Sequence, residues 1–99
     1  MPTTRNTKLL AIPKTYECLG FTIKVQYKEI DGLCGHFDPQ EGVMTLNPAS
    51  KEELLRQTFW HEAMHSFLIT LGYEELNSNE QFVDQIGQCL YQLEKTRKG

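Results

Sequence analysis

The feature that most constrains this chain is an apolar segment, Phe59–Leu71, that carries two histidines four residues apart. Residues with that spacing lie on one face of an α-helix, one turn from each other. An unpartnered polar ring inside an apolar helix is costly, so His61 and His65 indicate a shared partner. The spacing predicts a helix that presents two imidazoles to one metal ion, for which zinc is the usual choice.

Glu62 completes the pattern His-Glu-x-x-His. In this pattern the carboxylate can accept a proton from a metal-activated water and act as general base. With three histidines in 99 residues, the pattern arises by chance in roughly one such chain in a hundred. The alternative interpretation is a helix with two partly buried histidines and an exposed glutamate.

The length and composition indicate one globular domain. We predict a disordered N-terminus over residues 1–8 and a single domain over residues 9–95. Apolar residues make up 39% and charged residues 23%, as is usual for a soluble protein. The net charge of −3 argues against a nucleic-acid-binding surface.

The cysteines and the apolar runs bear on location. Cys18, Cys34 and Cys89 are odd in number and lack a Cys-x-x-Cys spacing, which predicts free thiols in a reducing compartment. No apolar run approaches the roughly 20 residues of a membrane span. Because the start of the chain also lacks the features of a signal peptide, we expect a cytoplasmic protein without a membrane partner.

The first half of the chain predicts strands. Residues 21–30 alternate apolar and polar side chains, which indicates a strand with one buried face. Residues 43–46 predict a second strand, closed by Asn47-Pro48, and the segments 16–19 and 35–37 predict shorter ones. The expected result is a small antiparallel sheet of three to four strands.

The second half predicts two helices. A capping box of Ser50 and Glu53 predicts a helix from Lys51 to Leu71, ended by Gly72. Ser78 predicts the start of another helix in the same way. Its expected core stripe consists of Phe82, Val83, Ile86, Cys89, Leu90 and Leu93. The fold class is therefore α+β, with the sheet followed by two packed helices.

Two histidines need a third metal ligand, and no histidine follows His65. Leu68 and Leu71 stand where a metzincin has glycine and histidine, which excludes that class. A downstream carboxylate is expected unless His36 folds in from the sheet. Glu80 at the start of the second helix is the first choice. Weaker candidates lie in the preceding turn: Glu74 and Glu75.

Asp84 follows Glu80 by one helical turn, and Gly87 lies on the same arc. The Asp84 carboxylate can accept a hydrogen bond from the second ring nitrogen of a ligating histidine, which would fix the tautomer. A glycine in mid-helix costs about 1 kcal/mol against alanine. Close approach of the first helix beside Glu80 and Asp84 would explain it.

These motifs resemble those of a known family. The helix with Thr-Phe-Trp-His-Glu-Ala-Met-His, then Gly72, then Asn-Glu-Gln-Phe-Val-Asp resembles small gluzincin-type metallopeptidases, in particular ImmA/IrrE-like and phage-encoded single-domain ones. The resemblance covers roughly residues 12–93. The resemblance implies one zinc bound by His61, His65 and Glu80, with Glu62 as the general base. It also implies that Asp84 supports the ligands without binding the zinc itself.

The chain also departs from the family. Met64 stands where ImmA-like proteins usually have glycine, and the interval from His65 to Glu80 is short against that of large gluzincins. The family supplies a tyrosine or histidine that stabilises the oxyanion. The candidates for that role here are His36, Tyr73 and Tyr91.

The expected function is zinc-dependent hydrolysis of peptide bonds in a peptide or protein substrate, through a metal-activated water with Glu62 as base. One alternative is a zinc-binding phage or mobile-element accessory protein that acts as an interaction module with little turnover. Another is a structural zinc protein, in which four protein ligands close the site. Cys34 and His36 are the residues that would have to supply the fourth ligand.

Overall fold

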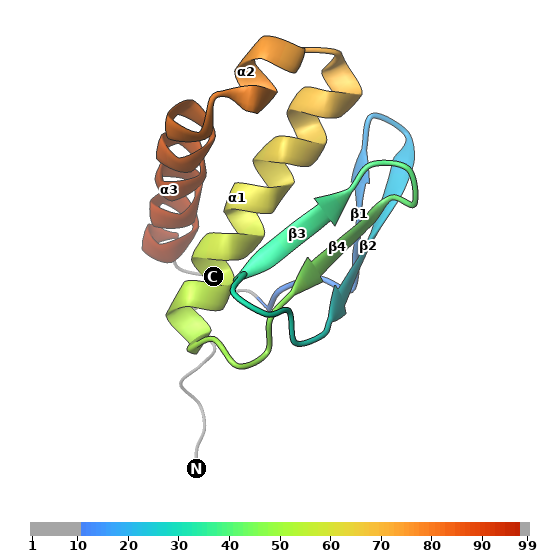
Figure 1. Ribbon diagram of the computed structural model, residues 1–99. Coiled ribbons are helices and arrows are strands. Elements are labelled where there is room, and N and C mark those ends of the chain that lie inside the picture. Colours follow the sequence, from blue (N-terminus) through green and yellow to red (C-terminus); the bar gives the residue numbers. More distant parts are fainter. Residues whose placement is uncertain (1–10, 98–99) are drawn as a thin grey trace.

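The computed structural model describes residues 11–97, so the expectation of a disordered segment over residues 1–8 lies outside the described part. The fold is α+β, as predicted, with helices on one side of a four-stranded sheet (Figure 1). The elements are β1 (Thr15–Cys18), β2 (Phe21–Tyr27), β3 (Gly35–Asp38), β4 (Val43–Leu46), α1 (Glu52–Leu71), α2 (Glu74–Ser78) and α3 (Glu80–Thr96).

The sheet is mixed rather than antiparallel. Its strand order is β1-β2-β4-β3; β1 pairs with β2 and β3 with β4 in antiparallel fashion, whereas β2 and β4 run parallel. The chain places β3 at the outer edge first and returns through a tight turn, in which Asp38 accepts hydrogen bonds from the backbone of Gln40 and Glu41. The returning strand, β4, then lies beside β2 in the same direction. Alternation of apolar residues predicts a strand but not its direction.

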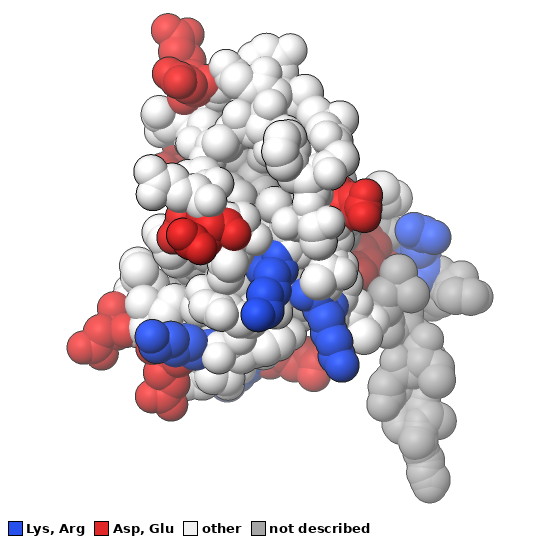
Figure 2. All heavy atoms as spheres, turned by 90° about the vertical axis from the view of Figure 1, so that its right-hand side faces the viewer, with Lys and Arg blue, Asp and Glu red and all other residues white. Residues whose placement is uncertain are grey.

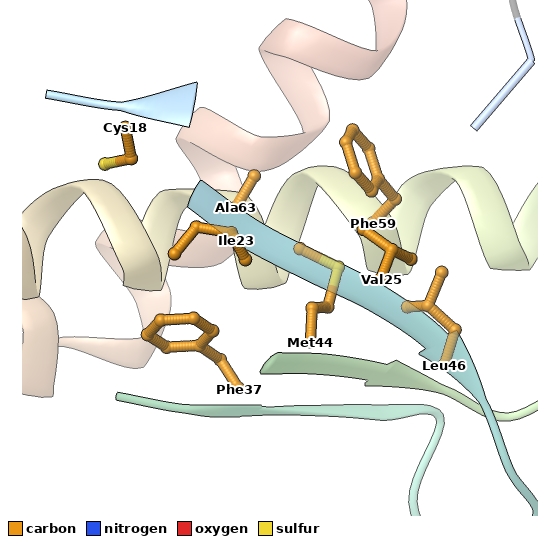
Figure 3. Close-up of a cluster of buried hydrophobic side chains, with 8 residues drawn as sticks. All are labelled: Cys18, Ile23, Val25, Phe37, Met44, Leu46, Phe59 and Ala63. Carbon is orange, nitrogen blue, oxygen red and sulfur yellow. The ribbon is translucent and has the colours of Figure 1, made fainter. Parts of the chain in front are cut away.

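One face of the sheet packs on α1. The alternation in β2 buries Ile23 and Val25, as predicted, and β4 contributes Met44 and Leu46, both completely buried. Figure 3 shows these side chains together with Phe37, Phe59 and Ala63, which complete the same core. The outer side of the sheet has basic and acidic groups interspersed (Figure 2).

The C-terminal end of α1 agrees with the prediction, and its N-terminal end does not. Gly72 ends the helix in the left-handed conformation, with φ of 84°, as expected. The predicted capping box is wrong: Lys51 is the N-cap residue, and no side chain caps this end. The Glu53 carboxylate instead accepts hydrogen bonds from the Tyr91 hydroxyl at 3.0 Å and from Lys95 Nζ at 3.3 Å. Glu53 therefore ties α1 to α3.

A short helix, α2, occupies the segment that was expected to be a turn. As a result α3 begins one residue later than predicted: Asn79, not Ser78, is its N-cap and accepts a hydrogen bond from the Phe82 backbone N–H at 3.0 Å. The Ser78 hydroxyl donates to the Glu74 carbonyl instead. This extra turn of helix places Asn77 against α1.

The buried face of α3 is rotated from the predicted stripe. It is centred on Val83, Gly87 and Tyr91, while Cys89 and Leu93 are exposed. The helices approach closely at Gly87, where a Cβ atom would lie 3.1 Å from the Cα atom of His61 and would force a small shift of the backbone. The predicted close approach of the two helices is confirmed, and it brings the start of α3 to the histidine face of α1.

Candidate metal centre

His61, His65 and Glu80 form the one group in the described residues whose side chains could together hold a metal ion. Each offers one ligand atom, and these atoms all lie within 4.8 Å of one another. His61 Nε2 is 3.3 Å from Glu80 Oε1, and His65 Nε2 is 3.4 Å from Glu80 Oε2. Two helices thus bring together the three ligands predicted from the sequence.

The separations between the imidazoles and the Glu80 carboxylate bear on how these groups could interact. A charge-assisted hydrogen bond between an imidazole and a carboxylate measures about 2.7–2.9 Å. Two ligands at about 2.0–2.1 Å from a tetrahedral ion are instead roughly 3.3–3.4 Å apart. The observed distances of 3.3 and 3.4 Å, each to a different Glu80 oxygen, are longer than a charge-assisted hydrogen bond and comparable to the ligand separation around an ion. The three side chains could therefore hold a metal ion.

The remaining ring nitrogens each face a side-chain oxygen, and for His65 the contact is a hydrogen bond. His61 Nδ1 faces Asp84 Oδ1 at 3.5 Å, and His65 Nδ1 lies 2.7 Å from Asn77 Oδ1. Because both partners are acceptors, they favour a hydrogen on each Nδ1 and leave each Nε2 lone pair for a metal. Asp84 lies where it was predicted.

Sequence reasoning missed Asn77. Its role depends on α2, which turns the chain between α1 and α3 and which the sequence indicated only as a loop. The available signal was an amide three residues before the predicted ligand Glu80. On its own, however, such a residue is common in turns.

Glu62 is nine-tenths buried beside the two histidines, with 9% of its surface exposed. Within residues 11–97 its carboxylate has no hydrogen-bond partner. Burial raises the pKa of the Glu62 carboxyl, and the neighbouring imidazoles, chiefly that of His65, offset part of the rise. A raised pKa brings a carboxylate closer to what a general base needs near neutral pH.

Two hollows open on either side of Glu62. The first has a volume of about 400 Å³ and lies between β3 and α2, with His65, Asn77 and Glu80 in its wall. The second, about 270 Å³, lies between the loop before β3, the first turns of α1, and α3. Because Glu62 and His61 line both, the two hollows border the same candidate site.

The other candidate residues do not join the ligand group. Glu74 and Glu75 lie exposed on α2 beside Tyr73. His36 lines the first hollow and Cys34 the second, and neither supplies a ligand atom to the group. The described residues thus offer three possible protein ligands, the number found in zinc sites with an open coordination position.

Neither the apolar character of the helices nor the comparisons with known proteins add to the identification of the site. No helix between residues 11 and 97 combines the length and the apolar character needed to cross a membrane. Comparisons of the chain with protein-family models, with curated proteins and with solved structures found no match. The resemblance to small gluzincins therefore stays a prediction from the motifs of α1 and α3.

Proposed function

We propose that this chain is a zinc-dependent peptidase that belongs with the small gluzincins. The observation that carries the proposal is the spacing of the two imidazole Nε2 atoms and the Glu80 carboxylate, 3.3 and 3.4 Å. His61, His65 and Glu80 would hold the ion. Two nitrogens and one carboxylate oxygen are the donor set of catalytic zinc in several peptidases. Bound zinc would supply a Lewis acid that polarises a carbonyl and acidifies water.

Glu62 is the general base in this proposal. Its buried carboxylate has no competing hydrogen-bond partner among the described residues, and it borders both hollows beside the ligands. It accepts a proton from the attacking water and then transfers that proton to the leaving amine. Asp84 and Asn77 hold the two imidazoles in place during the reaction.

An extended peptide can bind along β3. This strand is an edge of the sheet, so one side of its backbone has no partner strand. Gly35 of β3 lines both hollows. A peptide that adds to this edge would form backbone hydrogen bonds that do not depend on its side chains. It would also pass directly over Glu62.

His36 is the residue we assign to the oxyanion. Of the three candidates, the Tyr91 hydroxyl donates to Glu53, and Tyr73 lies beside α2 in a separate depression. His36 lines the first hollow with Glu62. His36→Ala should lower kcat about 10- to 1,000-fold while zinc content is unchanged. Tyr73→Phe serves as the control; an equal loss in that variant, or full activity of His36→Ala, would contradict the assignment.

The test of the function is Glu62→Gln. The amide cannot accept the proton, so the variant should retain zinc and the fold but lose hydrolysis of a peptide mixture. Zinc content and circular dichroism establish that the variant is otherwise intact. Equal cleavage by wild type and variant would remove Glu62 from the mechanism.

The second candidate is a zinc-binding interaction module. The Glu80 side chain is 68% exposed, so its ligand oxygens lie at the surface rather than under a covering lobe. A partner could therefore contact the site directly. Zinc-loaded wild type that cleaves neither the peptide mixture nor any candidate partner would favour this function over the first.

A further inference from the structure

The second hollow has the size of one side chain. Its volume of about 270 Å³ is below the roughly 300–1,000 Å³ of sites for small molecules. Leu54, Cys34 and Gly35 contribute the less polar part of the lining. The polar part includes Gln57, Thr58, Asp84 and Gln88. A long side chain with an apolar stem and a polar end suits such a lining.

One group in this hollow requires a partner. Thr58 is only 7% exposed, and its hydroxyl has no hydrogen-bond partner among residues 11–97. Its methyl group faces Gly35, where a Cβ atom would lie 2.5 Å from Thr58 Cγ2. A buried hydroxyl without a partner costs about 1–3 kcal/mol. Because Thr58 lines the hollow, its hydroxyl is available to a polar group of a ligand that enters there.

The charge of the lining selects the sign of that ligand. Glu62 and Asp84 are acidic, and no lysine or arginine lines the hollow in the described part of the chain. The surroundings have the same sign, because residues 52–96 contain eight acidic and two basic residues. Gln88 donates to Asp84 Oδ2 at 3.1 Å, which leaves the Gln88 amide oxygen as another acceptor. The acidic side chains and the Gln88 acceptor favour a cationic group, whereas an ion held by His61, which also lines the hollow, would oppose it.

We infer that this hollow selects a lysine or arginine next to the scissile bond of the substrate. The stem of that residue lies along Leu54, and its charged end reaches Asp84, Gln88 and the Thr58 hydroxyl. The inference rests on the proposed peptidase function, since the hollow borders Glu62 and His61. It adds the substrate class, which is peptides with basic residues.

The test uses binding as well as cleavage, so that it does not depend on turnover. Zinc-loaded wild type, which keeps both acidic groups of the hollow, is titrated with matched extended peptides that carry lysine, norleucine or glutamate at one position, and mass spectrometry verifies that each peptide stays intact during the titration. We expect the lysine peptide to bind about 10-fold more tightly than the norleucine peptide, and the glutamate peptide to bind most weakly. In wild type, mass spectrometry of a cleaved peptide library should give basic residues beside the cut.

Gln88→Lys is the informative variant and Gln85→Lys its matched control. Both add one positive charge to α3, but only residue 88 lines the hollow. Gln88→Lys should remove the preference for lysine while zinc is retained, and Gln85→Lys should leave it unchanged. Equal binding of the lysine and norleucine peptides, or equal effects of the two variants, would overturn the inference. Loss of cleavage with the binding preference intact would instead count against the peptidase function alone.

Discussion

One face of α1 packs on the sheet through Phe59 and Ala63, whereas the face toward α2 and α3 carries His61 and His65. The sheet side is apolar and closed; Met44 beneath it has no exposed surface. The histidine side leaves two Nε2 atoms and two carboxylate oxygens facing one point. The first region is an apolar core, and the second is a group of side chains that could hold a metal ion. The two regions should therefore respond to different perturbations.

The largest effect on stability is expected from Met44→Ala on the sheet side. Removing a completely buried side chain lowers the free energy of unfolding by about 2–5 kcal/mol. Denaturant unfolding measures the loss. Zinc bound per folded chain should stay unchanged, because Met44 does not contact the ligands. A folded Met44→Ala protein without zinc would show that the two regions are not separable.

Gly87→Ala tests the contact that joins α3 to the histidine face. The added Cβ atom would meet the backbone of His61 at 3.1 Å, and backbone cannot move aside as a side chain can. We expect a loss of about 1–3 kcal/mol from overpacking, although alanine favours a helix by about 1 kcal/mol. Zinc affinity should fall as well, because the ligands on the two helices are pushed apart. Denaturant unfolding measures the stability, and isothermal titration with zinc measures the affinity. Gln85→Ala, at an exposed site on the same helix, is the control; higher stability with unchanged affinity would contradict the packing.

Asn77→Ala should lower zinc affinity about 10- to 100-fold, since Asn77 orients His65. Asp84→Ala should have a smaller effect, because its distance to His61 Nδ1 is 3.5 Å rather than 2.7 Å. Competition with a chelator gives the affinities. Asn79→Ala is the control: it removes the cap of α3 and costs about 1 kcal/mol of stability, but it should leave affinity unchanged. A larger loss in Asn79→Ala than in Asn77→Ala would refute the role of Asn77.

The smallest effect is a pH dependence on the sheet side. Burial raises the pKa of Tyr16 from 10.0 to about 12, although its hydroxyl is hydrogen-bonded to Ser66. A folded pKa above the unfolded value means that the contribution to stability is complete below pH 10 and is lost as the pH rises toward 12. After allowance for the exposed part of the ring, the loss is about 1–2 kcal/mol. Unfolding of Tyr16→Phe over this range should lack that part of the decline; identical pH curves would contradict the assignment.

The sequence predicted what is local and strongly patterned. The period of a helix was enough to predict that His61 and His65 lie on one face. That Glu80 and Asp84 lie near them followed from one further assumption, that the next helix folds back on the first. Asn77 could not be predicted because its position depends on α2, a short helix without a strong signal. The parallel pairing of β2 and β4 depends on the position of β3 in the sheet. The alternation of apolar and polar residues predicts a strand but not its position. The prediction of a capping box was wrong because the Glu53 carboxylate is bonded to Tyr91 and Lys95. This contact joins two helices, so it cannot be predicted from the residues next to Glu53.

The most direct test of the account is the metal centre itself. We expect purified wild type to bind about one zinc per chain, with X-ray absorption showing two imidazoles and one carboxylate oxygen in the first shell. Glu80→Gln should bind zinc far more weakly, because a neutral amide oxygen replaces a charged ligand. Zinc bound equally well by wild type and Glu80→Gln, or a zinc shell without imidazoles, would contradict the account.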